Sequence, residues 1–285
     1  MKAINILLPS LLCFNAIESN KIERVLFIGL DGAGNFYQQI DTPNIHKLFG
    51  SGAYTNNAQA MKPTSSGQNW GSMLTGVIPE RHGVTNGNIN NHYYNKTEYP
   101  TVYKTILNYS SNATIASIVS WAPLNKGLTE EGLKLDKVTS NDATVLTSTL
   151  DYITKRGKDS KFMFVYFGNI DETGHNKGWL SKEYIKEYKL VDSYIGKILA
   201  KLEEAKLRDS TLILMTADHG GIGKTHGGNS KEETQILFGA SGPGISPKKL
   251  DDTVRNMDIF AITLKALNIP LPSYIDSKVP SNLFD

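Results

Sequence analysis

Five uninterrupted apolar runs of strand length recur along the chain, and helical patterns separate them. The runs cover residues 24–30, 113–120, 161–168, 210–216 and 234–240. Apolar residues in continuous rather than alternating order are typical of strands that are covered on both faces. The alternation of such strands with helices predicts an α/β protein, a three-layer α/β/α sandwich around a largely parallel sheet.

The segments between the runs carry helix signals. Residues 140–157 and 181–206 place apolar side chains three or four positions apart. In the longer segment these positions include Leu190, Tyr194, Ile198 and Leu202. A last helix is expected from 257 to 267, with Asn256 as its N-cap. No internal repeat or long linker interrupts the pattern, so we expect one α/β domain over residues 21–285.

The first 20 residues have the layout of a secretory signal peptide, with Lys2, a short apolar stretch and then polar residues. The apolar stretch is too short to cross a bilayer, which needs about 20 such residues. We therefore expect a cleaved signal and a secreted or extracytoplasmic protein. The alternative is an N-terminal helix that packs on the domain of a cytoplasmic protein.

Charge and cysteine content exclude two classes of site. The chain has 30 basic and 28 acidic residues, so it lacks the excess of Lys and Arg expected of a nucleic-acid-binding surface. The only cysteine is Cys13, which rules out an internal disulfide and a zinc site made of cysteines.

Acidic and imidazole side chains follow three of the predicted strands. Asp31 comes directly after the first run, Asp171 and His175 follow the third, and Asp218 and His219 follow the fourth. In an open parallel sheet, the ligand site lies beyond the carboxyl ends of the strands. These five side chains are therefore expected at one edge of the sheet.

The stretch "MTADHGGIGKTHGG" (215–228) adds His226 to this set. An Asp after a strand is often only a turn former or helix cap, but several acids on a partly buried rim would repel one another and lose hydration. A divalent cation removes that cost. Three aspartates and three histidines without a thiolate suit zinc or another first-row metal, as one ion or two.

A second group of candidate functional residues lies in the segment "KPTSSGQNWGSMLTGVIPERHGVTNGN" (62–88). Its apolar spacing predicts a short helix that starts near Gly67, with Ser65 or Ser66 at its N-terminus. Free amides and the helix dipole at this point favour an anion such as phosphate. These serines could simply cap the helix, but beside a metal site a hydroxyl becomes a candidate nucleophile.

The order of these motifs resembles the alkaline phosphatase superfamily, and its closest branch is the type I phosphodiesterase and nucleotide pyrophosphatase group. The resemblance covers roughly residues 23–285. It is carried by Asp31 followed by "PTSSGQNWGSMLTGVIPERHGVTNG", "DETGH", "TADHGG", "THGG", "GPGI" and "MDIFAITLKALNIPLP".

The resemblance implies an alkaline-phosphatase-like fold and two divalent metal ions, most simply zinc. One ion would be held by Asp171, His175 and His226. The other would be held by Asp31, Asp218, His219 and the oxygen of the nucleophile, Ser66.

The same branch places its nucleophile at the fourth residue of a P-T-x-[ST] segment, which is Ser66 here, with Ser65 as the alternative. It also uses an Asn shortly after "HG" to hold a non-bridging phosphoryl oxygen. Asn86 and Asn88 flank the matching position, and we choose Asn86. His82 of "ERHG" is interpreted as structural.

The implied activity is hydrolysis of phosphodiesters or pyrophosphates through a covalent phosphoserine, on a small-molecule phosphate ester. A monoester dianion is usually met by an arginine or by a further metal ion, and no arginine except Arg81, which lies in a turn, is near the expected site, so a phosphodiester or pyrophosphate is favoured. The aromatic residues that could stack a leaving group are Trp70, Trp121, Tyr93 and Tyr94, and ordinary packing or loop exposure is their alternative role.

Three other functions stay open. Two are enzymatic, a phosphomonoesterase and a phosphonoacetate hydrolase-like enzyme. The third is an inactive, metal-stabilised binding protein. Sulfatases share the fold, but the C/S-x-P-x-R context of their nucleophile is absent from "TSSGQ".

Overall fold

The structure is a computed structural model and describes residues 21–91 and 98–285, so the expected signal peptide and both Tyr93 and Tyr94 lie outside the described residues. Its strands are β1 (Arg24–Leu30), β2 (Ala53–Gln59), β3 (Thr114–Val119), β4 (Asp136–Thr139), β5 (Ser160–Phe167), β6 (Thr211–Ala217), β7 (Gln235–Ser241) and β8 (Lys248–Lys249). They form one sheet in the order β4-β3-β5-β1-β6-β7-β2-β8. Among these strands only β7 runs antiparallel to its neighbours, so the sheet is largely parallel, as predicted.

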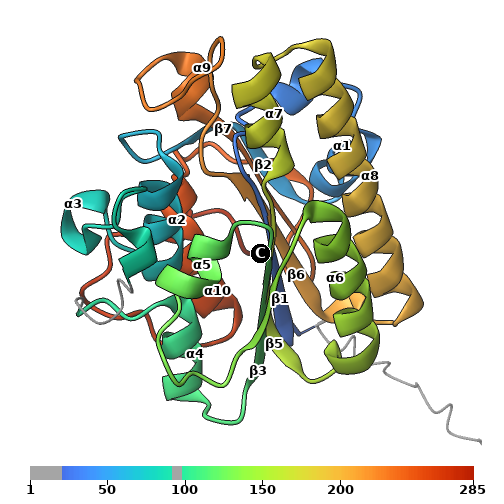
Figure 1. The fold of residues 1–285 in the computed structure, drawn as a ribbon. Helices are drawn as coiled ribbons and strands as arrows, with labels where there is room; N and C mark the ends of the chain where they lie inside the picture. Colours follow the sequence, from blue (N-terminus) through green and yellow to red (C-terminus); the bar gives the residue numbers. More distant parts are fainter. Residues whose placement is uncertain (1–20, 92–97) are drawn as a thin grey trace, which may run out of the picture.

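Helices cover both faces of this sheet (Figure 1). One face carries α2 (Ser66–Thr75), α4 (Val102–Tyr109), α5 (Ala122–Gly127) and α10 (Ile259–Ala266). The other face carries α1 (Pro43–Gly50), α6 (Asp142–Arg156) and α8 (Lys182–Glu204). The predicted three-layer α/β/α sandwich is confirmed.

The remaining helices are short. They are α3 (Pro79–His82), α7 (Asn169–Lys177), α9 (Lys231–Thr234) and the 3₁₀ turns η1 (Phe36–Gln39), η2 (Ile89–Asn91), η4 (Arg208–Ser210) and η5 (Asn256–Asp258). Within the described ranges, no helix is both long and apolar enough to cross a membrane.

The five apolar runs correspond to β1, β3, β5, β6 and β7, whereas β2, β4 and β8 were not predicted. Strand β2, "AYTNNAQ", lacks a continuous apolar run because only alternate parts of it are buried. Strand β4 has largely exposed side chains at one edge of the sheet. The search for uninterrupted apolar runs therefore finds the sheet centre and misses its margins.

Two helix details were predicted wrongly. Leu190 is 42% exposed, because Tyr188 and Val191 occupy the buried stripe of α8 at this level. Asn256 does not cap the last helix. It begins η5, and Asp258 is the N-cap of α10.

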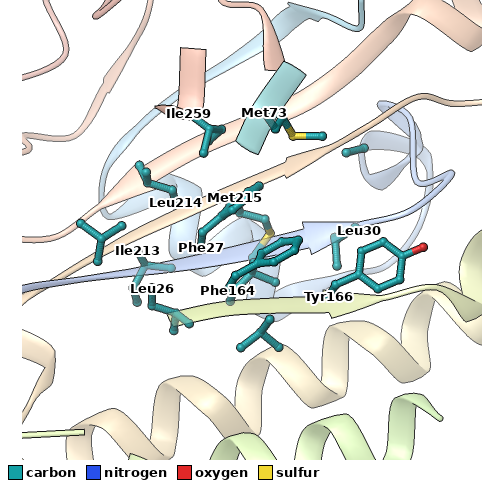
Figure 2. Packing of buried hydrophobic residues seen from close by; sticks show 14 of the residues in the cluster. Leu26, Phe27, Leu30, Met73, Phe164, Tyr166, Ile213, Leu214, Met215 and Ile259 are labelled. Atoms are coloured by element: carbon teal, nitrogen blue, oxygen red, sulfur yellow. The ribbon is translucent and has the colours of Figure 1, made fainter. Parts of the chain in front are cut away.

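The core extends along the central strands to the edge where they end (Figure 2). The rings of Phe27 on β1 and Phe164 on β5 stack with centroids 4.9 Å apart. Tyr166 lies further along β5, beside Leu30 (Figure 2), and is also buried. Buried aromatic side chains thus pack along β1 and β5 up to the edge where these strands end.

Candidate active site

Three adjacent strands bring the predicted acidic and imidazole residues to one edge of the sheet. Strands β5, β1 and β6 are neighbours and parallel, so their carboxyl ends meet. Asp31 follows β1, Asp218 and His219 follow β6, and α7 begins two residues after β5 and carries Asp171 and His175. Their i, i+4 spacing places these last two on one face of α7.

An inner cluster forms around Nε2 of His219. This atom lies 3.2 Å from Oδ2 of Asp218, 3.6 Å from Oδ1 of Asp31 and 3.2 Å from Oγ of Ser66. All four residues are buried. We call Asp31, Asp218, His219 and Ser66 the inner cluster.

An outer cluster consists of Asp171, His175 and His226. The carboxylate of Asp171 lies 3.4 Å from Nε2 of His175 and 3.8 Å from Nε2 of His226, and these two nitrogen atoms are 3.1 Å apart. Asp171 also has an oxygen within 4.8 Å of ligand atoms of Asp31 and His219. The two clusters are therefore contiguous, with Asp171 between them.

Main-chain carbonyl oxygens orient all three imidazole rings. In each ring, Nδ1 lies within hydrogen-bonding distance of one such oxygen. The pairs are His175 with Lys224 (3.0 Å), His219 with Gly220 (2.8 Å) and His226 with Thr64 (2.7 Å). A ring that donates its Nδ1 hydrogen to a carbonyl directs the lone pair of Nε2 toward a metal.

Three buried carboxylate oxygens in the clusters have no hydrogen-bond donor among the described residues. They are Oδ1 of Asp31, Oδ1 of Asp171 and Oδ2 of Asp218. A buried polar atom without a partner is costly, and a divalent cation would satisfy all three oxygens. Together with imidazole nitrogens they form the oxygen and nitrogen donor set that zinc accepts.

The other oxygens of the two inner aspartates are held by hydrogen bonds. Oδ2 of Asp31 accepts from the indole Nε1 of Trp70 at 3.0 Å and from the hydroxyl of Tyr166. Oδ1 of Asp218 accepts main-chain N–H groups of Gly32 and His219. Each inner carboxylate therefore has one oxygen fixed by the protein and one directed to the cluster.

Burial and like charge make this arrangement unfavourable without a cation. Burial, aided by the charge of Asp171, raises the pKa of Asp31 to about 6. Burial and the charges of Asp31 and Asp171 raise the pKa of Asp218 well above its usual value. For Asp171, burial is opposed by the hydrogen bond from His175 and by the histidine charges, which lower its pKa overall.

The pKa values of His175 and His219 shift in opposite directions. The hydrogen bond with Asp171 raises the pKa of His175 to about 9, whereas burial lowers the pKa of His219. A proton on His175 therefore offsets part of the outer negative charge. A metal ion would take over this role.

Helix α2 brings its first residue, Ser66, into the inner cluster, and Ser65 is the N-cap outside it. Gly67 follows, and a side chain here would collide with the main chain of Asn86, 2.7 Å from the Cβ position. The close approach lets the N–H of Gly67 donate to Oδ1 of Asn86 at 2.6 Å. The amide nitrogen of Asn86 is then the group left to donate to a ligand.

Asn88 lies differently. Its side chain accepts from the N–H of Thr85 and donates to the carbonyl of Gly83, so both ends are used within its own loop. Of the two asparagines, only Asn86 is among the residues found to line the cleft described next.

A cleft of about 450 Å³ opens beside both clusters. Its walls include Asp31, Ser66, Asn86, Asp171, His175 and His226. Trp121 also lines it, whereas Trp70 is fully buried and so packs in the core instead of offering a stacking surface. None of the described residues in its walls is a lysine or arginine.

The two basic residues of "ERHG" lie outside the cleft walls. His82 is buried, its ring contacts Ser72 and the N–H of Val84, and burial lowers its pKa to about 4. Arg81 forms an ion pair with Asp276 at 2.8 Å. The structural role predicted for His82 agrees with these contacts.

Three supporting residues were missed in the sequence analysis. Tyr166 fixes Asp31, as described above. Asp142 accepts the N–H groups of residues 168 and 169 and so holds the start of α7. Asn256 donates to the carbonyl oxygen of Asp218. Polar residues beside or within apolar segments were the only sequence signal for all three.

Known proteins share both the sequence pattern and the fold. The family model for type I phosphodiesterase/nucleotide pyrophosphatase matches residues 25–229. Venom phosphodiesterase 2 of Crotalus adamanteus is 26% identical over 204 residues, which are 62% of this chain and 24% of the venom protein. The chain thus spans about a quarter of that relative's length.

Solved structures give the same result for the fold. Murine ectonucleotide pyrophosphatase/phosphodiesterase 5, an inactive variant in complex with AMP, superimposes with a TM-score of 0.74 at 16% identity, covering 89% of this chain and 97% of that one. A 2-O GAG sulfatase gives a TM-score of 0.68 at 15% identity, covering 90% and 73%. The predicted alkaline-phosphatase-like fold is confirmed.

Proposed function

Because this chain belongs to the type I phosphodiesterase/nucleotide pyrophosphatase family, we propose that it is a metal-dependent hydrolase that cleaves phosphodiester or pyrophosphate bonds in a small-molecule phosphate ester. The observation that carries the proposal is the position of Ser66. Its Oγ lies at the wall of the cleft, 3.2 Å from Nε2 of His219, and the same nitrogen lies 3.2 Å and 3.6 Å from the donor-free oxygens of Asp218 and Asp31.

Two divalent cations, zinc by preference, are the proposed cofactors. The outer ion would be held by Asp171, His175 and His226. The inner ion would be held by Asp31, Asp218, His219 and Ser66. When bound, such a pair lowers the pKa of the nucleophile and offsets the charge on the attacking and departing oxygens.

The side chains of the cleft then carry out a two-step displacement. Oγ of Ser66 gives its proton to solvent and bonds to phosphorus while the bond to the leaving oxygen breaks; this oxygen takes up a proton from solvent and departs as an alcohol or phosphate, which leaves a phosphoserine. Water then bonds to phosphorus and the Ser66–phosphorus bond breaks, and a proton released by the water restores the Ser66 hydroxyl. The amide nitrogen of Asn86 donates to a non-bridging oxygen, where it stabilises the charge of the transition state.

The walls of the cleft favour a diester over a monoester. A monoester dianion calls for a cationic partner such as arginine. None of the described lining residues is an arginine or lysine, the two lining histidines are proposed metal ligands, and Arg81 is paired elsewhere. The neutral amide of Asn86 suits the single charge of a diester.

We propose an extracytoplasmic location. The related proteins include venom phosphodiesterases and ectonucleotide pyrophosphatase/phosphodiesterases, and residues 1–20 have the layout of a signal peptide. Expression of the full chain with a C-terminal tag tests this, because a processed N-terminus and tag outside the cytoplasm are expected. An intact N-terminus on a cytoplasmic protein would contradict it.

The central experiment compares Ser66→Ala with the matched variant Ser65→Ala. We expect Ser66→Ala to lose hydrolysis of bis-p-nitrophenyl phosphate, keep at least the outer metal and keep its fold, whereas Ser65→Ala stays active. Hydrolysis by Ser66→Ala would refute the assignment of the nucleophile. In the wild type, preference for p-nitrophenyl phosphate would indicate a monoesterase, and metal binding without hydrolysis of either ester would indicate a binding protein.

A further inference from the structure

One acidic side chain in the cleft has no role in the proposed reaction. Glu172 directly follows Asp171 on α7, is exposed and lines the cleft. It stands three residues before His175, so it shares that face of the helix, and its charge acts on the imidazole. Unlike Asp31 and Asp171, Glu172 belongs to neither group of candidate metal ligands.

Beyond Glu172 and the residues of the two clusters, the lining of the cleft is neutral and mostly polar. It includes hydroxyl and amide side chains and one indole, among them Ser120, Trp121, Ser140, Asn141 and Asn169. Hydroxyls and amides bind neutral polar groups, and an indole face attracts both apolar groups and cations. In the part of the cleft that the structure describes, the only basic side chains are His175 and His226, which are proposed metal ligands, so no lysine or arginine balances Glu172.

The two proposed metal ions would not compensate the charge of the Glu172 carboxylate. With Ser66 ionised, its oxygen and the three aspartates carry four negative charges, which two divalent cations balance. Glu172 then gives the loaded cleft an excess of one negative charge. Every further negative charge on a substrate is repelled, whereas a neutral or cationic group is not.

We propose that Glu172 is a specificity-determining residue that makes this cleft select phosphodiesters whose second alcohol is neutral or cationic, against pyrophosphates and monoesters that carry more negative charge. This inference rests on the proposed function and decides between the two bond types that it leaves open. Glu172 acts on substrate binding, so its effect is expected in KM more than in kcat.

The test compares p-nitrophenyl phosphocholine, bis-p-nitrophenyl phosphate and ATP as substrates of the zinc-loaded enzyme. Wild type is expected to prefer the first two. In Glu172→Gln, the ratio of kcat/KM for ATP to that for the choline ester should rise on the order of tenfold, since each exposed charge interaction contributes roughly two- to fivefold. Glu172→Lys should raise this ratio further, and Glu172→Asp should keep it near the wild-type value. Added salt should diminish the difference between Glu172→Gln and the wild type.

Glu183→Gln is the matched control, because Glu183 is an exposed acid in the first turn of α8 and is not among the residues that line the cleft. Its substrate ratio should equal that of the wild type. A wild type that cleaves ATP as well as the choline ester would overturn the proposal, as would an unchanged ratio in Glu172→Gln.

A binding experiment separates this proposal from the proposed function. In zinc-loaded Ser66→Ala, calorimetry compares the affinity for phosphocholine with that for ADP, with and without Glu172→Gln. A gain in relative affinity for ADP on removal of the charge supports the proposal even when no ester is hydrolysed. Equal relative affinities refute it, even when the wild type is an active diesterase.

Discussion

After removal of metal ions with EDTA, Asp31 should destabilise the folded protein increasingly as the pH rises from 4.5 to 7. Its carboxyl group lies buried beside other carboxylates and has a pKa of about 6 in the folded chain. Between pH 3.8 and about 6, Asp31 keeps a proton in the folded state that it has released in the unfolded state. The contribution of Asp31 to stability therefore decreases with rising pH across this window, whereas the lowered pKa of His82 has the opposite effect in the wild type and in Asp31→Asn alike.

The expected size follows from the shift. A rise from 3.8 to about 6, at about 1.4 kcal/mol per pH unit, corresponds to about 3 kcal/mol lost above pH 6. Asp218 shifts in the same direction and adds to the loss. Zinc binds the ionised carboxylates, so the stabilisation by zinc should grow over the same interval.

Urea unfolding followed by circular dichroism, at pH 4.5 and 7 with EDTA or zinc, measures both effects. Comparison with Asp31→Asn isolates the contribution of Asp31, because all other titrating groups remain. Without metal at pH 7 this variant should be more stable than the wild type by up to about 3 kcal/mol, and the difference should vanish at low pH. The exposed control Asp159→Asn should change little. If Asp31→Asn destabilises the metal-free protein at pH 7, the argument from buried like charge is wrong.

Three further outcomes are expected. Asn86→Ala should lower kcat for bis-p-nitrophenyl phosphate roughly 100-fold with metal content unchanged, and Asn88→Ala should not; equal losses would contradict the role of the amide. Zinc binding to the outer cluster at pH 7 should release about one proton, because the pKa of His175 is about 9 in the metal-free protein. Calorimetry in two buffers of different ionisation enthalpy measures this proton, and a release of zero would contradict the role of His175 as a ligand. Tyr166→Phe should weaken binding of the inner zinc about tenfold in chelator competition, since Asp31 loses a donor, and unchanged affinity would show that Trp70 alone suffices.

The sequence predicts the strands of the sheet centre and the residues at their ends for one physical reason. A strand buried on both faces must be apolar throughout, so the first polar residue after it marks the edge where parallel strands end. Asp31 and Asp218 could be found in this way. Strand β2 could not, because its alternating burial leaves no continuous apolar signal.

Apolar runs in the sequence cannot predict the hydrogen bonds that fix the ligand side chains, because these bonds join distant parts of the chain. The donors to Asp31 lie 39 and 135 residues away in the sequence, at Trp70 and Tyr166. Each of these aromatic residues looks like ordinary core when read alone. Only the packing of α2 and β5 against β1 reveals that they also serve as hydrogen-bond donors.

The contacts of the three histidines with main-chain carbonyls have an evolutionary consequence. The direction of each ring depends on the path of the backbone and not on the identity of the residue that provides the oxygen, at Thr64, Gly220 or Lys224. A mutation of the exposed Lys224 can therefore leave the ring in place, whereas Gly220 is constrained because a Cβ atom there would lie 2.0 Å from the carbonyl oxygen of Glu232. A site held in this way can tolerate sequence change at solvent-exposed positions while the ligand rings keep their directions.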